Sequence, residues 1–277
     1  MKKLIELLLN FLRKIFGKKE NDNGGLTVGE SENIEVNTEN VEETAQEAEE
    51  TDEPDDEDDA VLETVAPDEK PKIKILVDNG HGNNTAGKRS PYSMHKVEPA
   101  IDFYEYKWNR EIAKPIVDEL VRRGYDAELL VPEITDISLT ERANRANAWC
   151  KKLGKNRVLL LSIHANAAGS GRQWMTGRGW CAYTTRGETK SDKFAEFLYK
   201  EAEKNFKGHR LRRDTTDGDS DQEANFTIIY NSWCPAVLTE NFFYDNVDDV
   251  RYILSEEGRA AVIKTHVDGI INYINSL

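Results

Sequence analysis

The stretch that decides the fold reads R-V-L-L-L-S-I over residues 157–163 and continues as H-A-N to residue 166. Its unbroken apolar run is typical of a strand that other elements cover on both faces. A second such run, K-I-K-I-L-V-D, spans residues 72–78, and a turn-rich segment over residues 79–90 follows it. Both patterns predict buried strands that end in polar loops.

Helical patterns alternate with these strands along the chain. Apolar residues recur at helical spacing over residues 107–123 and 139–153, and Gly124 supplies a stop for the first helix. The remaining elements are expected as helices over residues 190–206 and from 248 or 255 to 274, and as strands over 125–131, 179–184, 226–230 and 236–242. This alternation predicts one α/β domain built on a mainly parallel sheet.

The N-terminal quarter of the chain has a different composition. Residues 21–71 contain 20 Asp and Glu against the single Lys70, and no Trp, Tyr or Phe. Such a segment buries too little apolar surface to offset its ordering entropy, so we expect an acidic, disordered linker. Residues 72–277 carry a net charge of only +1, which argues against a nucleic-acid partner because phosphate binding needs a basic domain.

Residues 1–20 are predicted to form a basic amphipathic helix. Leu, Ile and Phe recur at helical spacing among lysines and arginines, but the apolar run is too short to cross a bilayer. Three interpretations stay open: an anchor that contacts the membrane surface through residues 1–19, a helix that packs on a partner or on itself, and an atypical export signal without a small-residue cleavage site. The flanking lysines favour the anchor.

The cysteines do not predict a metal site or a disulfide framework. Cys150, Cys181 and Cys234 are odd in number and lack a C-x-x-C spacing. We expect buried free thiols.

Polar residues follow the predicted strands where each one ends. His81 comes after the first strand in V-D-N-G-H-G, His164 follows residues 157–163, and Glu240 closes the run A-V-L-T-E-N. Because loops converge at the carboxyl ends of strands in open α/β sheets, these side chains are expected to lie close together. Gly80 and Gly82 let the backbone turn tightly around His81.

Two histidines with one carboxylate and a water molecule are a common ligand set for catalytic zinc. The carboxylate is expected from a nearby helix start, where Glu105 opens an E-x-x-x-N pattern. Glu98 and Asp102 are rival candidates, and Asp78 is expected to brace the loop.

Four blocks of sequence occur in a recognisable order. V-D-N-G-H-G, the E-x-x-x-N of residues 105–109, S-I-H-A-N-A at 162–167 and P-A-V-L-T-E-N at 235–241 resemble the zinc-dependent N-acetylmuramoyl-L-alanine amidases of the amidase-3 type. The resemblance covers roughly residues 72–275. It implies a mixed, mainly parallel sheet flanked by helices on both faces, one Zn²⁺ ion, and hydrolysis of the bond between N-acetylmuramic acid and L-alanine in peptidoglycan.

Carried over residue by residue, the resemblance makes His81, Glu105 and His164 the metal ligands and Glu240 the catalytic glutamate, which would take a proton from a zinc-activated water. Asn166 is expected to support the site. The chain departs from the family pattern in the loop G-N-N-T-A-G-K after His81. It also departs in residues 210–223, R-L-R-R-D-T-T-D-G-D-S-D-Q-E, a longer and more charged segment than expected.

The implied partner is peptidoglycan, attacked by a monomer in the bacterial cell envelope or outside the cell. An autolysin and a bacteriophage endolysin both fit, and a phage enzyme would stay in the cytoplasm until lysis. The alternatives are a zinc peptidase, carboxypeptidase or acylase with another substrate, and a non-catalytic wall-binding module.

Histidines, arginines and tryptophans outside these four blocks carry weaker signals. His95 lies in a loop that could line the substrate cleft, whereas His209 and His266 are expected at the surface. The arginines of residues 210–213 either meet stem-peptide carboxylates or belong to a solvated loop. Trp174, Trp180 and Trp233 are more typical of core residues than of platforms that stack on sugars, and they stay unassigned.

Overall fold

The two long apolar runs form neighbouring strands at the centre of one sheet in the computed structural model, which describes residues 72–277. β1 (Lys74–Asn79) pairs in parallel with β3 (Val158–Asn166), and all six residues of β1 are buried. The expected cover on both faces is therefore present. The predictions made for residues 1–71 lie outside the described residues.

The sheet has six strands in the order β2-β1-β3-β6-β4-β5. β2 (Asp126–Leu129) and β6 (Ala236–Phe243) extend its parallel part, while β4 (Cys181–Thr184) runs antiparallel to β6. β5 (Gln222–Glu223) pairs in parallel with β4 and was not predicted, because two residues are too short for a periodic pattern. The predicted mixed, mainly parallel sheet is confirmed.

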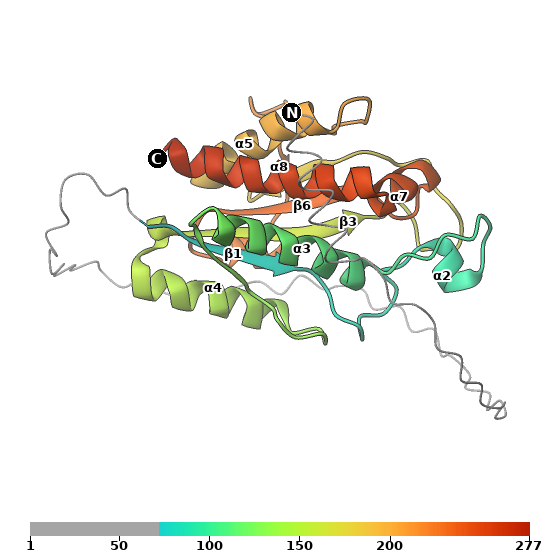
Figure 1. Ribbon diagram of the computed structural model, residues 1–277, viewed down its shortest axis with the longest axis horizontal. Coiled ribbons are helices and arrows are strands. Elements are labelled where there is room, and N and C mark those ends of the chain that lie inside the picture. Colours follow the sequence, from blue (N-terminus) through green and yellow to red (C-terminus); the bar gives the residue numbers. More distant parts are fainter. Residues whose placement is uncertain (1–71) are drawn as a thin grey trace, which may run out of the picture.

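Helices cover both faces of this sheet (Figure 1). The face that carries Ile75 and Val77 packs against four helices, α3 (Glu105–Arg122), α5 (Lys190–Asn205), α7 (Val247–Leu254) and α8 (Glu256–Asn275). The face that carries Leu76 packs against α4 (Leu139–Leu153) and the short α6 (Thr227–Tyr230). A 3₁₀ turn (Lys155–Arg157) leads into β3, and α2 (Pro91–His95) lies beyond the carboxyl ends of β1 and β3.

The C-terminal helical region consists of two helices divided at Ser255. The backbone N–H of Ser255 donates to carbonyls of α7, while its side chain accepts from the N–H of Gly258 in the first turn of α8. One residue therefore ends α7 and caps α8. The sequence offered two start points for the last helix, near residues 248 and 255. The first is close to the start of α7 and the second to the start of α8.

The predicted strand over residues 226–230 is wrong, because Thr227–Tyr230 forms helix α6. A run of four or five apolar residues has no period that separates a strand from one buried helical turn. Tertiary contacts decide here: Ile228 and Ile229 pack on the face covered by α4, and the Asn147 side chain of α4 binds the backbone of Asn231 and Trp233.

The thiols lie where they were expected: Cys150, Cys181 and Cys234 are buried and free. Of the tryptophans left unassigned, Trp180 is fully buried and Trp174 is half-buried against the core, whereas Trp233 is 53% exposed.

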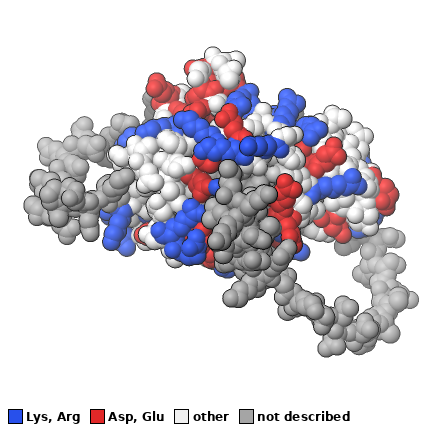
Figure 2. Space-filling model, turned by 45° about the horizontal axis from the view of Figure 1, so that its top comes forward, with Lys and Arg blue, Asp and Glu red and all other residues white. Residues whose placement is uncertain are grey.

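The surface mixes charges of both signs. Figure 2 shows Lys and Arg together with Asp and Glu over the face drawn there. Within residues 72–277, no helix has the length and apolarity needed to span a bilayer.

The two histidines expected at the surface are partly or fully covered, so those predictions were wrong. His209 is half-buried and stacks on Tyr252 with ring centroids 3.7 Å apart. His266 is fully buried in α8, with Nδ1 at 2.7 Å from the Val262 carbonyl and Nε2 at 2.9 Å from Thr239 Oγ1. Because a carbonyl only accepts, Nδ1 donates to Val262 and Nε2 accepts from Thr239. Burial lowers the pKa of His266 to about 4.

This burial predicts a pH-dependent loss of stability. The unfolded chain protonates His266 near its ordinary pKa of about 6.5, whereas the folded chain keeps it neutral down to about pH 4. Between these values the unfolded state binds more protons, so the free energy of unfolding falls as pH drops, by about 3 kcal/mol from this residue in total.

Urea unfolding of the wild type and His266→Gln between pH 4 and 7.5 measures this contribution. We expect the stability of the wild type to fall more steeply with decreasing pH than that of His266→Gln. His95→Gln, which changes an exposed imidazole, should follow the wild type. Equal slopes for the wild type and His266→Gln would show that His266 titrates normally in the fold.

Candidate metal centre

The loop after β1 presents His81 through an unusual backbone conformation. His81 itself has a positive φ of 65°, which is uncommon for a residue with a side chain. Gly80 and Gly82 are required for close approach instead: a Cβ on Gly80 would lie 2.1 Å from His164 Cε1, and one on Gly82 would lie 1.9 Å from the backbone N of Asp136. The two glycines thus let the loop lie directly against the end of β3 and the chain before α4.

Helix α3 holds this loop in place from its first two turns. Asn109 Nδ2 donates to the Gly80 carbonyl at 3.0 Å, and Arg110 Nη1 donates to the His81 carbonyl at 2.9 Å. Asn109 lies one turn after Glu105, so the E-x-x-x-N pattern places a carboxylate and a loop anchor on one face of the helix. The role of Arg110 was missed from the sequence.

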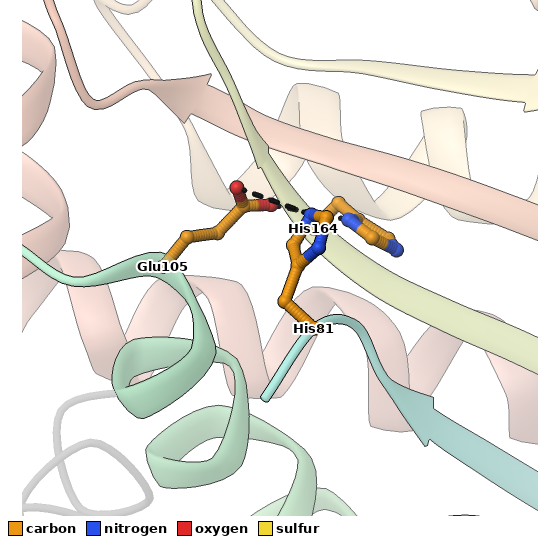
Figure 3. A group of neighbouring side chains, drawn as sticks. All are labelled: His81, Glu105 and His164. Atoms are coloured by element: carbon orange, nitrogen blue, oxygen red, sulfur yellow. Dashed lines mark hydrogen bonds and ion pairs between the residues drawn. The ribbon is translucent and has the colours of Figure 1, made fainter. Parts of the chain in front are cut away.

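Three side chains from separate elements converge at the carboxyl ends of β1 and β3 (Figure 3). His164 Nδ1 lies 3.1 Å from Glu105 Oε1, and His81 Nε2 lies 3.4 Å from Glu105 Oε2. The two imidazole rings meet edge to face, with centroids 4.9 Å apart. One nitrogen or oxygen from each of the three residues lies within 4.8 Å of the others.

The rival acids do not join this group. Glu98 and Asp102 are exposed, and Asp102 accepts a hydrogen bond from Ser93 Oγ at 2.8 Å. His95, at the end of α2, is also exposed. Of the candidates for the third ligand, the structure brings only Glu105 to the two histidines.

The three side chains shift one another's pKa values. Burial alone would raise the pKa of Glu105, but hydrogen bonds with His164 and His81 outweigh it and lower the pKa. Burial likewise works against a charged His164, yet the hydrogen bond to Glu105 raises the pKa of His164 above its ordinary value. The carboxylate is thus ionised, and its negative charge favours a cation beside it.

The donor set fits a transition-metal ion. Imidazole nitrogens and a carboxylate oxygen about 2.0–2.2 Å from a tetrahedral ion lie about 3.3–3.5 Å from one another. The contacts of Glu105 with His164 and His81, at 3.1 and 3.4 Å, are close to these separations. The two contacts use different oxygens of Glu105, and one donor atom of each residue lies within 4.8 Å of the others.

Glu240 lies beside the group without belonging to it. It occupies the position on β6 opposite His164 on β3, and its Oε2 is buried without a hydrogen-bond partner. Burial raises the pKa of Glu240 to about 7, with His164 opposing the rise and the charge of Glu105 adding to it. A carboxyl group with this pKa can accept and release a proton near neutral pH.

A buried network of charged and polar side chains connects the interior beside the site to the loop after β1. Arg142 donates to Asp78 Oδ1 at 2.5 Å and to Asp136 Oδ1 at 2.7 Å, and Ser162 Oγ donates to Asp78 Oδ2 at 2.6 Å. Asp136 also accepts from Thr85 Oγ1, which in turn accepts from the N–H of Gly82. Asp78 itself contacts Arg142 and Ser162, and it connects to the loop only through Arg142 and Asp136. Arg142 carries no signal in the sequence beyond its place in a helical pattern.

Asn241 fixes the backbone of His164 and was missed as a site residue. Its Nδ2 donates to the His164 carbonyl at 2.9 Å, and its Oδ1 accepts from Trp180 Nε1 at 2.9 Å. The residue lies in the quoted block P-A-V-L-T-E-N, which was the available signal. Asn166, expected to support the site, accepts from the N–H groups of Ala167 and Tyr244, so its contacts shape the end of β3.

A pocket of about 340 Å³ opens beside the two histidines, and Leu139 and Arg142 are among its other lining residues. It provides space next to the metal group for part of a substrate. Of the arginines in residues 210–213, Arg213 forms an ion pair with Glu203 at 2.6 Å. The Arg212 guanidinium lies near enough to Glu240 to lower its pKa.

Comparison with known proteins gives consistent matches. The N-acetylmuramoyl-L-alanine amidase CwlM of Bacillus licheniformis is 27% identical over 206 residues, covering 73% of this chain and 69% of that protein. The endolysin of Bacillus phage SPP1 is 25% identical over 203 residues, covering 73% of this chain and 66% of that protein.

A solved structure matches the fold as well. The crystal structure of an N-acetylmuramoyl-L-alanine amidase from Clostridium difficile 630 superposes with a TM-score of 0.60 at 26% identity, covering 74% of this chain and 98% of that chain. The model of the N-acetylmuramoyl-L-alanine amidase family, amidase-3 type, matches residues 75–272. That match spans well over half of the sequence and includes the whole metal group. The chain therefore belongs to the amidase-3 family of N-acetylmuramoyl-L-alanine amidases.

Proposed function

We propose that the chain hydrolyses the amide bond between N-acetylmuramic acid and L-alanine in peptidoglycan, with a zinc ion held by His81, Glu105 and His164 and with Glu240 as the general base. One observation carries this proposal: two imidazoles and a carboxylate converge on one point, next to a second carboxylate that stays outside the group. Family membership supports the substrate and the bond that is cleaved.

The donor chemistry supports zinc. Catalytic zinc sites often combine two histidines with one carboxylate and keep a fourth position for water or substrate. Sites for Ca²⁺ or Mg²⁺ are built from oxygen ligands, which two imidazoles do not provide. The chemistry that zinc supplies when bound is Lewis acidity, which makes water a better nucleophile near neutral pH and polarises the amide carbonyl.

The protein groups supply the proton transfers. Glu240 Oε2, buried and without a hydrogen-bond partner, can accept the proton of the attacking water. The protonated Glu240 then donates this proton to the departing nitrogen of L-alanine, which completes hydrolysis of the amide. Its raised pKa suits both halves of the exchange, because the ionised and protonated forms are close in free energy near pH 7.

The proposed partner is peptidoglycan, and the proposed working form is a monomer acting at the bacterial cell wall. All four site residues come from one chain, so no second copy is needed to complete the centre. The similar proteins include a bacterial amidase and a phage endolysin, and both an autolysin and an endolysin role suit this site. Residues 1–19 remain a proposed contact with the membrane surface.

Substitutions distinguish the role of the proposed general base from that of the proposed metal ligands. Glu240→Gln should keep one zinc per chain but lose activity by about 10²–10⁴-fold, because the amide cannot accept the proton of water. His81→Ala and His164→Ala should lose both zinc and activity. The measurements are zinc content by atomic spectroscopy and the loss of turbidity of purified cell walls.

Glu98→Gln and Asp102→Asn are the matched controls, since both positions are exposed and outside the group. They should retain zinc and nearly full activity. A Glu240→Gln variant that digests walls at the wild-type rate would remove Glu240 from the mechanism.

Adding a methyl group at Gly80 should damage the site without changing any ligand. Its Cβ would lie 2.1 Å from His164 Cε1, so the imidazole must move. We expect Gly80→Ala to weaken zinc affinity at least about 10-fold, as displaced ligand orientation does in other zinc sites. Competition with a chromogenic chelator measures this affinity.

Gly87→Ala serves as the control, because it changes a glycine of the same loop whose added Cβ would meet nothing within 4 Å. This variant should lose some stability at its positive φ yet bind zinc normally. Wild-type zinc affinity in Gly80→Ala would refute the steric account of the loop.

The products identify the bond that is cleaved. Mass spectrometry of digested peptidoglycan should show free muramoyl groups together with stem peptides that begin with L-alanine, and a zinc chelator should abolish both. Products that are shortened only at the carboxyl end of the stem peptide would instead indicate a carboxypeptidase.

A further inference from the structure

A second group of potential metal ligands lies away from the catalytic centre. Asp192, Asp219 and Asp221 each place a carboxylate oxygen within 4.8 Å of those of the other two. Asp192 belongs to the first turn of α5, and the other two precede β5 in the charged segment 210–223. This segment is where the sequence departs from the family pattern, and the catalytic site does not use its acids.

The group has no compensating positive charge. Asp221 is only 1% exposed and Asp192 only 9%, yet within residues 72–277 none of the three forms an ion pair with Lys, Arg or His. Asp221 Oδ2 accepts from the buried Thr184 Oγ1 at 2.5 Å, whereas its Oδ1 is buried and has no hydrogen-bond partner. A buried carboxylate with an unused oxygen is costly unless a cation or a donor satisfies it.

The three acids are also held in place before any ligand arrives. Asp192 accepts from the N–H of Thr189 in the capping box of α5, and Asp219 Oδ1 accepts from the N–H of Asp221 at 3.3 Å. Asp221 is fixed by its hydrogen bond to Thr184 on β4. Like charges are thus held close together, and burial with the added charge of Asp219 raises the pKa of Asp221 to about 7.

We propose that Asp192, Asp219 and Asp221 bind a Ca²⁺ ion. All available donors are oxygens, which suits a hard cation and not zinc, and Ca²⁺ accepts the irregular geometry that a loop and a helix start provide. Asp219 and Asp221 occur at alternate positions, a spacing that calcium-binding loops use to turn successive carboxylates toward one ion. The unused Oδ1 of Asp221 is the oxygen that this ion would satisfy.

Such an ion would anchor the charged segment to the edge of the sheet. β5 pairs with β4 over only two residues, so the strand contributes little to holding the segment. On β4, Cys181 lies opposite Glu240, while Thr184, three residues further along, contacts Asp221. The same segment begins near Arg212, whose charge acts on Glu240. The Ca²⁺ site therefore fixes the end of segment 210–223 that contains Asp219 and Asp221. The start of the same segment contains Arg212, which lies close to the proposed base Glu240.

Thermal unfolding of full-length protein at constant zinc, with and without Ca²⁺, tests this proposal. At about 100 times its Kd, Ca²⁺ should raise the Tm of the wild type by about 5 °C or more. Asp219→Asn should lose this rise. Asp217→Asn, which neutralises an exposed acid of the same loop outside the group, should keep it. The acidic residues 21–71 are identical in all variants, so differences between variants exclude their contribution.

Asp221→Asn adds a test that does not depend on the size of the shift. Without Ca²⁺ it should be at least as stable as the wild type, because it removes a buried uncompensated charge and still accepts from Thr184. With Ca²⁺ the order should reverse. An equal Ca²⁺ response in the wild type and Asp219→Asn, no response in the wild type, or an Asp221→Asn variant that is less stable under both conditions would each overturn the site.

Discussion

The parallel pairing of β1 with β3 is the constraint on which the rest of the site depends. In this register Asn79 lies opposite Ile163, and the N–H of Gly80 donates to the Ile163 carbonyl at 3.1 Å. His81, just beyond the end of β1, and His164, near the end of β3, therefore lie at the same end of the sheet. A slip of one residue would turn the side chains of one strand to the opposite face and separate the two imidazoles.

The metal group is held by buried polar contacts that cost stability. Arg142 pairs with Asp78 in the interior, where removing Arg142 would leave Asp78 as an uncompensated buried charge. Glu105 is almost fully buried among two imidazoles and the N–H of Ala165. These buried charges are tolerated because each has a partner of opposite charge or a hydrogen-bond donor. The same contacts orient the proposed metal ligands. Stability and function are therefore coupled at this edge of the sheet.

The sequence predicted the features that depend on local pattern, and it failed where tertiary contacts decide. The apolar runs predicted β1 and β3, and the strand-end rule pointed to His81 and His164 from their positions alone. Glu105 was favoured over its rivals by its place at a helix start, although family resemblance was needed to assign the role of Glu240. The helical conformation of residues 227–230 and the burial of His266 depend on neighbours far apart in sequence, which no local period encodes.

X-ray diffraction from crystals of the zinc-loaded protein, recorded above and below the zinc absorption edge, tests the central claim most directly. The account predicts one strong anomalous peak within bonding distance of a His81 nitrogen, a His164 nitrogen and a Glu105 oxygen, with Glu240 nearby but not bound. A fully active protein without this peak, or with the zinc held by other residues, would contradict it.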